Sequence, residues 1–273
     1  MYKKALSSYT KALAIKPNDA AICSSLGSAY AKDGDEASAI IYYERALEID
    51  PLHSITKHML SALKGTRTDT APRSYVETLF DGYANHFEES LINQLEYDTP
   101  GHLTRVMIDK SSSKSLGSML DLGCGTGLLG DLVVKHVDYL EGIDLSKKML
   151  AEAEKKDIYD KLVHTDILDY LRSRSLDFDY FVSSDVFIYL GALDELFQLI
   201  KSKNKRNGKL VFSTEHREGS DFFLEKSGRY SHSKDYIEKL CKNHGYRISF
   251  FTTSNLRKSM GVFITGGLYI LDF

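Results

Sequence analysis

The apolar residues of this chain follow two different periodicities. Residues 1–64 carry apolar side chains at helical spacing, whereas from residue 118 onward short apolar runs alternate with helical stretches. Between these parts, KGTRTDTAPR at positions 64–73 is polar, contains Gly and Pro, and has no apolar period, which is typical of a linker. We therefore predict a helical segment over 1–64, a linker over 65–73 and a larger domain over 74–273.

The larger domain has the strand–helix rhythm of a parallel sheet covered on both faces. Its last two strand candidates have no helix between them and are joined by SNLRKSMG, which predicts an antiparallel pair. Residues 74–110 are predicted to be helical, with Leu79, Tyr83, Phe87 and Leu91 close to one face. The fold class is thus α/β, a doubly wound, Rossmann-like sheet of seven strands with an antiparallel last strand. The strand candidates are 118–122, 139–143, 162–165, 179–183, 209–213, 247–253 and 262–271, and helices are expected near 127–136, 147–155, 167–172, 192–203 and 234–244.

The N-terminal segment repeats itself at a spacing of 34 residues. This period, with LGSAY between its two copies, resembles the tetratricopeptide repeat, a helix–turn–helix unit in which small residues allow close packing. The resemblance implies a possible protein partner, with polar positions such as Asn18, Ser24, Ser28 and Lys32 left for a groove. So few repeats either lean on the next domain or lack upstream neighbours. The matching pairs are Ala5 and Ala39, Tyr9 and Tyr43, Ala12 and Ala46, and Pro17 and Pro51.

Composition narrows the functional classes. The chain has 273 residues, 42% of them hydrophobic, and a net charge of −3, which predicts no general attraction to nucleic acid. Its three cysteines, Cys23, Cys124 and Cys241, are far apart and form no disulfide or zinc pattern. The amphipathic start is not a secretory signal, and no apolar run is long enough to span a bilayer, so we expect no membrane association and a cytoplasmic location.

A glycine-rich stretch, MLDLGCGTGLLG from Met119 to Gly130, follows an apolar run that ends in an acid. Its spacing satisfies two patterns: the GxGxxG fingerprint of dinucleotide-binding dehydrogenases and the DxGxGxG pattern by which methyltransferases hold S-adenosylmethionine. An antiparallel final strand favours the second pattern. A dehydrogenase usually continues into a second nucleotide-binding half, for which the roughly 155 residues from position 118 leave little room.

Three acids follow three successive strand candidates. Asp121 would lie near the cationic methionyl end of the donor, and Asp144 would accept hydrogen bonds from both ribose hydroxyls. Ser146 can cap the next helix, which leaves Asp144 available. Asp166 would accept the adenine amino group, with Ile167 beside the ring, or it would instead cap the helix that follows. Cys124 is interpreted as a small turn residue.

On the motifs LDLGCGTG, GIDLS and HTDI the chain resembles the class I S-adenosylmethionine-dependent methyltransferases. With FDGYANHFEESL, VFIYLGAL and GRYSHS it is similar to predicted methyltransferases that carry tetratricopeptide repeats. The resemblance implies S-adenosylmethionine as cofactor, S-adenosylhomocysteine as product, and a small-molecule or carrier-bound acceptor. Tyr75 and Tyr83 are predicted to form a lid at the methionyl end, unless they only pack the helical segment on the sheet. The cofactor-binding candidates are Tyr75, Tyr83, Asp121, Gly123, Gly125, Gly127, Asp144, Leu145, Met149, Asp166, Ile167, Ser184 and Asp185.

The acceptor side is less defined, because a base is needed only if the acceptor carries a proton that must leave. Ser184 and Asp185 are expected to border the transferred methyl group. The catalytic candidates are Tyr189, His216 and His232. The plain alternative for Tyr189 is a core tyrosine, and that for His216 is a solvated loop histidine. His232 and Tyr230, both in GRYSHS, are expected to close over the site. Glu215 is expected on the same rim, and no metal site is predicted. Two other functions stay open, a non-catalytic S-adenosylmethionine-binding scaffold and a nicotinamide-dependent oxidoreductase.

Overall fold

The computed structural model describes residues 2–84, 87–89, 96–259 and 261–273. The chain divides into two compact units. The first contains Met1–Tyr75 together with Leu224–Arg229, and the second contains Val76–Phe223 together with Tyr230–Phe273. The division after Tyr75 lies two residues beyond the predicted end of the linker, whereas the return of residues 224–229 to the first unit was not predicted.

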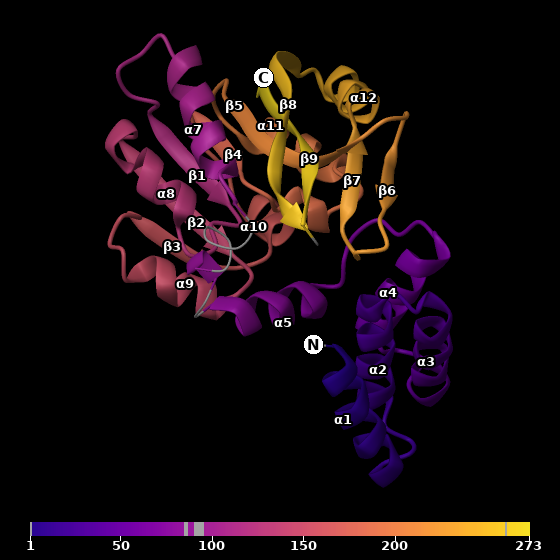
Figure 1. The fold of residues 1–273 in the computed structure, drawn as a ribbon. Coiled ribbons are helices and arrows are strands. Elements are labelled where there is room, and N and C mark those ends of the chain that lie inside the picture. Colours follow the sequence, from indigo (N-terminus) through magenta and orange to yellow (C-terminus); the bar gives the residue numbers. More distant parts are fainter. Residues whose placement is uncertain (1, 85–86, 90–95, 260) are drawn as a thin grey trace. The chain divides into compact units, whose positions relative to one another are not determined.

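The first unit is built from helices (Figure 1). Asp19 caps the second helix by accepting a hydrogen bond from the Ile22 amide, and Gly34 ends that helix in the left-handed conformation, φ 90°. A Cβ atom on Gly27 would lie 2.5 Å from Cδ1 of the buried Tyr43 ring, which confirms that this glycine allows close helix packing. The helices are α1 (Tyr2–Ile15), α2 (Ala20–Asp33), α3 (Glu36–Ile49) and α4 (Ser54–Lys64).

A short return of the chain, Leu224–Arg229, completes the first unit. His58 Nε2 of α4 donates to the Gly228 carbonyl oxygen at 2.9 Å, and Lys226 pairs with Glu36 of α3 at 2.8 Å. The Tyr75 ring lies 5.3 Å from the His58 ring. Burial lowers the pKa of His58, with the Gly228 bond opposing it. The loop at 224–229 is therefore held by helices about 170 residues earlier in the chain.

The second unit is organised around a mostly parallel sheet (Figure 1). Its strand order is β3-β2-β1-β4-β5, and antiparallel β9 pairs with β5 on one side and β8 on the other. All seven predicted strands are present in the described residues, and a pair of short strands, β6 and β7, raises the total there to nine. The strands are β1 (Ser118–Leu122), β2 (Tyr139–Asp144), β3 (Lys161–His164), β4 (Tyr180–Ser183), β5 (Lys209–Arg217), β6 (Phe222–Leu224), β7 (Tyr230–Ser233), β8 (Arg247–Ser259) and β9 (Val262–Asp272).

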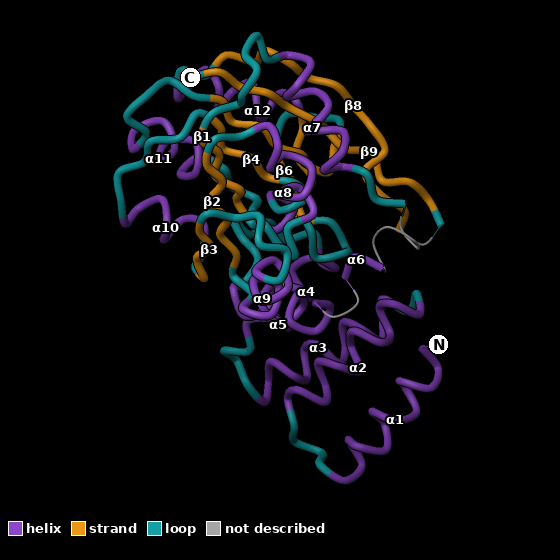
Figure 2. Tube along the Cα trace, turned by 90° about the vertical axis from the view of Figure 1, so that its left-hand side faces the viewer, coloured by secondary structure: helices purple, strands orange, loops and turns teal. Residues whose placement is uncertain are grey.

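Helices cover both faces of this sheet. On one face, Leu103 of α7 and Leu129 of α8 join a buried cluster with strand residues such as Val211. On the other, Phe212 of β5 contacts Phe197 of α11, with ring centroids 6.0 Å apart. Figure 2 gives a second view of these layers. The helices are α5 (Arg73–Tyr83), α6 (Phe87–Glu89), α7 (Thr99–Lys110), α8 (Leu128–Val133), α9 (Lys147–Glu154), α10 (Ile167–Ser173), α11 (Asp194–Lys203) and α12 (Lys234–His244), with 3₁₀ turns at Val134–His136 and Phe187–Tyr189.

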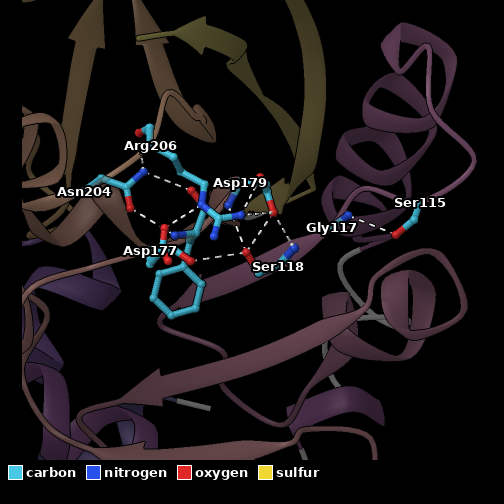
Figure 3. A network of polar contacts seen from close by, with 8 residues as sticks. Ser115, Gly117, Ser118, Asp177, Asp179, Asn204 and Arg206 are labelled. Carbon is cyan, nitrogen blue, oxygen red and sulfur yellow. Dashed lines mark hydrogen bonds and ion pairs between the residues drawn. The ribbon is translucent and has the colours of Figure 1, made fainter.

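A polar network ties together the amino ends of β1 and β4 (Figure 3). Asp179 Oδ2 accepts hydrogen bonds from both the amide and the hydroxyl of Ser118, each at 2.8 Å. Arg206 pairs with Asp177 at 2.5 Å and with Asp179 at 3.2 Å. Burial raises the pKa of Asp179, but the bonds from Ser118 and Arg206 outweigh it and hold the pKa below its usual value. This network fixes the amino ends of these strands, whereas the candidate site lies at their carboxyl ends.

Three further properties bear on chemistry. Cys23, Cys124 and Cys241 are buried free thiols. Within the described residues, no group of three or more His, Cys, Asp or Glu side chains is arranged to hold a metal ion. Of the helices seen in the described ranges, none is both long and apolar enough to cross a membrane.

Candidate functional site

The glycine-rich turn joins the carboxyl end of β1 to α8. Three glycines of this turn have the left-handed backbone conformation, which residues other than glycine rarely adopt. They are Gly123, Gly125 and Gly127, with φ of 79°, 55° and 86°. The Ile143 carbonyl oxygen accepts from the Gly123 amide at 2.9 Å and the Cys124 amide at 3.0 Å, which ties the turn to β2. A Cβ on Gly123 would lie 2.6 Å from Val186 Cγ2, whereas one on Gly125 would meet only Phe87 at 3.9 Å. Gly125 is thus the position where the turn leaves room.

Asp144 ends β2 and binds the turn. Its Oδ2 accepts from the Gly125 amide at 2.9 Å, and its Oδ1 accepts from the Ser146 amide at 2.7 Å. Ser146 caps α9 through its hydroxyl, which accepts from the Met149 amide, so the predicted capping role of Ser146 is confirmed. Burial raises the pKa of Asp144, while the amide bonds oppose that rise. The Leu145 amide also bonds this carboxylate, so at least one of its roughly four acceptor sites remains for a ribose hydroxyl.

Asp121 lies one residue before the end of β1 and is buried. Its Oδ2 accepts a hydrogen bond from the Tyr159 hydroxyl at 2.8 Å. Burial raises the pKa of Asp121 to about 7, the Tyr159 bond lowers it, and the nearby Asp144 charge raises it further. Tyr159 was missed by the sequence reasoning. A Cβ on Gly130 would lie 2.5 Å from its hydroxyl, so this glycine is required by the space that Tyr159 occupies.

The residues after β3 show the alternative that the sequence had left open. Asp166 Oδ1 caps α10 by accepting from the Leu168 amide at 2.9 Å and the Asp169 amide at 3.3 Å. The carbonyl oxygen of Leu145, after β2, accepts from His164 Nε2 at 2.9 Å, while Met149 is buried. The roles of Asp166 and Ile167 toward adenine, and those of Leu145 and Met149 in the donor site, stay predictions.

Helices α5 and α6 contribute contacts to the loops at the carboxyl ends of the strands. Asp81 accepts from the Ser146 hydroxyl at 2.5 Å, and Glu88 accepts from the Thr126 hydroxyl at 2.7 Å. The Phe80 ring lies 5.4 Å from that of Tyr189. These contacts connect the segment to the loops after β2, β1 and β4, in that order.

The two tyrosines predicted for the lid have different surroundings. Tyr83 is 51% exposed, and Tyr75 belongs to the first unit, where it contacts His58. Their donor-binding role stays a prediction, while the contacts to the strand ends come from their neighbours in α5 and α6. Leu91, part of the predicted apolar helix face, is outside the described residues.

The loop after β4 carries a buried ionic group. Arg257 of β8 pairs with both Asp185 and Glu215, and all three side chains are largely buried. The Asp185 amide donates to the Ser213 hydroxyl at 2.8 Å. The predicted loop around SNLRKSMG is wrong at this point, because β8 continues through Arg257, and β5 likewise runs on through Glu215 instead of ending at residue 213.

Next to this group, the Ser184 and Tyr97 hydroxyl oxygens lie 2.9 Å apart. Burial, reinforced by the Asp185 charge, raises the pKa of Tyr97 above its usual value. Ser184 and Asp185 therefore stand at the end of β4 beside a tyrosine that the sequence reasoning did not select. No local pattern pointed to Tyr97, because its partner is 87 positions away.

The three catalytic candidates are more enclosed than expected. His216 lies within β5, not in a loop, with its side chain 12% exposed and its ring 5.9 Å from Phe251. His232 and Tyr230 lie fully buried in β7, so they do not form a covering loop. His232 Nε2 donates to the Gly191 carbonyl at 3.0 Å, and burial lowers the pKa of His232 to about 4, which keeps the ring neutral. Tyr189 is buried in its 3₁₀ turn.

Comparisons with known proteins match this architecture. Residues 120–212 match the family model of a methyltransferase domain, and residues 20–53 match that of a tetratricopeptide repeat. An uncharacterized protein of Haemophilus influenzae is 38% identical over 113 residues, in an alignment that covers 36% of this chain and 42% of that protein. The chain thus spans about two fifths of the length of this relative.

Solved structures share the fold at low identity. Magnesium protoporphyrin IX methyltransferase from Synechocystis with bound S-adenosylmethionine has a TM-score of 0.56 at 16% identity, covering 73% of this chain and 96% of that one. An S-adenosylmethionine-dependent methyltransferase from Clostridium acetobutylicum has a TM-score of 0.52 at 19% identity, covering 71% and 99%. The N-methyltransferase NodS from Bradyrhizobium japonicum, with S-adenosylhomocysteine, has a TM-score of 0.50 at 16% identity, covering 63% and 84%. Residues 120–212 therefore match a methyltransferase domain in a chain that shares the fold of S-adenosylmethionine-dependent methyltransferases, and residues 20–53 match a tetratricopeptide repeat.

Proposed function

We propose that the second unit transfers the methyl group of S-adenosylmethionine to a small-molecule or carrier-bound acceptor and releases S-adenosylhomocysteine. The observation that carries this proposal is the pairing of Asp144 with the glycine turn, in which one carboxylate accepts the Gly125 and Ser146 amides. That pairing places an acid with spare lone pairs beside a turn with room at Gly125. Hydroxyl groups of a ribose fit such an acid, and S-adenosylmethionine supplies them.

The donor brings a methyl group already activated by a sulfonium, so the protein needs mainly to align and desolvate the reactants. In our proposal Asp144 holds the ribose, Asp121 lies toward the methionyl ammonium, and Asp166 with Ile167 borders the adenine. The segment carrying Phe80 and Asp81 excludes water from these strand ends, because it contacts the loops after β2 and β4.

The fold does not indicate the chemical class of the methyl acceptor. Among the structural neighbours, one is a magnesium protoporphyrin IX methyltransferase and another an N-methyltransferase. Shared architecture therefore coexists with different named substrates, and the acceptor has to be inferred from this chain's own residues near the end of β4.

For the first unit we propose recruitment of a protein partner, with no catalytic side chain contributed. Tetratricopeptide helices present surfaces that bind extended peptides or other helices. Two of the four residues expected in a groove are bonded within the unit: buried Ser24 accepts from the Thr56 hydroxyl at 2.7 Å, and half-buried Ser28 bonds Tyr43 at 3.1 Å. A partner would therefore contact other positions, such as Lys32.

Calorimetry tests the donor assignment. Binding of S-adenosylhomocysteine at micromolar affinity, with no heat from a nicotinamide dinucleotide, is the expected result. The opposite preference would refute the proposal in favour of an oxidoreductase. Incubation of cell extract with radiolabelled S-adenosylmethionine, followed by separation according to size, then distinguishes a free small acceptor from a carrier-bound one.

A further inference from the structure

Asp185, the second residue after β4, has an unusual backbone. Its φ is 61°, in the left-handed region that residues other than glycine rarely occupy and that costs free energy to maintain. Two contacts hold it there. Its amide donates to the Ser213 hydroxyl at 2.8 Å, and its carboxylate Oδ2 pairs with Arg257. The conformation is thus imposed by neighbouring strands and aims the side chain in a fixed direction.

The two oxygens of this carboxylate are not equivalent. Oδ2 accepts from Arg257 Nη1, whereas Oδ1 is buried and has no hydrogen-bond partner in the described structure. Only 13% of the side chain is exposed, so solvent does not serve as a ready substitute. A buried carboxylate oxygen without a donor is costly, and such atoms in native proteins require an explanation. A ligand that supplies the donor is one.

The charges around Asp185 indicate the kind of ligand. Arg257 also pairs with Glu215, so this cation is shared between two carboxylates. Asp121 and Asp144 stand at the ends of β1 and β2 in the same sheet. A carboxylate acceptor would bring a further negative charge to this buried group, at an electrostatic cost. A group with an N–H or O–H proton avoids that cost and satisfies Oδ1.

Resting on the proposed function, we propose that Asp185 Oδ1 receives the proton-bearing nucleophile of the acceptor, which is therefore an amine or an alcohol and not a carboxylate. The nucleophile's lone pair forms the bond to the methyl carbon while the carbon–sulfur electron pair returns to sulfur, giving the neutral thioether. The proton of the nucleophile passes to Asp185 Oδ1. Arg257 is a positioning residue in this scheme, because it bonds Oδ2 and so leaves Oδ1 to accept from the nucleophile.

A test that needs no knowledge of the acceptor uses two ligands. Sinefungin carries an ammonium-bearing carbon where S-adenosylmethionine carries its methyl sulfonium, whereas S-adenosylhomocysteine has no group there. Sinefungin thus presents N–H donors at the position of the transferred methyl. For the unmodified protein we expect calorimetry to show sinefungin binding at least about tenfold more tightly than S-adenosylhomocysteine, as one charge-assisted hydrogen bond requires. Equal affinity would overturn the inference without touching the proposed function.

Two variants locate the effect. Asp185→Asn keeps the shape and, as asparagine tolerates the left-handed backbone, should fold. It should lose about tenfold in sinefungin affinity, while S-adenosylhomocysteine affinity changes by less than about threefold. Glu215→Gln is the matched control, since it removes an equal charge from Arg257's other partner, and its sinefungin affinity should change by less than about threefold. If Asp185→Asn weakens the binding of both ligands equally, then Asp185 acts only by supporting the structure. If both variants lose the same sinefungin affinity, then Asp185 acts only through the overall electrostatic field of the site. Failure of the unmodified protein to bind S-adenosylhomocysteine would instead refute the proposed function.

Discussion

Replacing Asp144 with alanine should weaken donor binding by at least tenfold, if this carboxylate holds the ribose. The carboxylate has two oxygens, and each already accepts one backbone amide, from Gly125 at 2.9 Å and from Ser146 at 2.7 Å. With a third bond from the Leu145 amide, at least one of the carboxylate's roughly four acceptor sites is left for a ribose hydroxyl. The variant therefore removes at least one charge-assisted hydrogen bond from the bound ligand.

The magnitude follows from that count. A hydrogen bond to a charged group contributes about 1.5–3 kcal/mol, so losing one bond alone corresponds to roughly a tenfold to 150-fold weaker complex. A second ribose bond to the same carboxylate would be coupled to the first, and the two would not add fully. The freed amides of Gly125 and Ser146 also loosen the turn, which adds a loss unrelated to the ribose.

A cycle of two proteins and two ligands separates these contributions. We would measure the dissociation constants of S-adenosylhomocysteine and of its 2′-deoxy analogue by calorimetry, for the parent and for Asp144→Ala. The parent should prefer the hydroxylated ligand by about tenfold, and the variant should show no preference. If the folded variant binds S-adenosylhomocysteine as tightly as the parent does, or keeps the same preference, then Asp144 does not hold the ribose.

Three further outcomes are expected. Burial raises the pKa of Asp121 to about 7, so its carboxyl group is largely neutral below that pH. The ammonium of S-adenosylhomocysteine favours the charged carboxylate, so the ligand should bind more tightly as the pH rises through 7. In calorimetry, Asp121→Asn should make the affinity nearly independent of pH in this range. Chymotrypsin should cleave after Phe80 more slowly when S-adenosylhomocysteine is saturating, whereas equal cleavage rates would mean that α5 only packs on the sheet. Asp179→Ala loses two bonds from Ser118 at the far edge of the sheet, so chemical denaturation should show a loss of about 1–3 kcal/mol with the ligand affinity unchanged. A weaker affinity for S-adenosylhomocysteine in this variant would contradict the view that the amino ends of the strands do not affect the donor site at their carboxyl ends.

Five of the seven predicted strands lie within one residue of their expected bounds at each end, whether they are fully buried or partly exposed. Positions 118–122 form β1 as predicted, because an apolar run bounded by turn residues leaves little choice of conformation. The failures lie where polar residues are buried. Glu215 and Arg257 look like loop residues in the sequence, yet each is buried because the other neutralises it from a distant strand. Such a pairing cannot be read from one segment alone.

The candidate site divides along the same line. The glycine turn, Asp121 and Asp144 could be selected because their proposed roles follow from local order along one chain segment. Tyr159 and Tyr97 were not, because each matters only through a partner, 38 positions from Asp121 in one case and 87 from Ser184 in the other. The strand formed by Tyr230–Ser233 was also missed, since four residues with three polar side chains give no strand signal.

The return of Leu224–Arg229 to the first unit changes what can be cut or exchanged in this protein. The chain passes between the units at three places, after Tyr75, after Phe223 and after Arg229. Removing residues 1–65 would take away the partners of Gly228 and Lys226 and leave the loop between β6 and β7 without its support. The repeat is therefore not a detachable N-terminal tag. A chimera that exchanges it has to exchange the 224–229 loop as well, and selection acting on one of these two segments constrains the other.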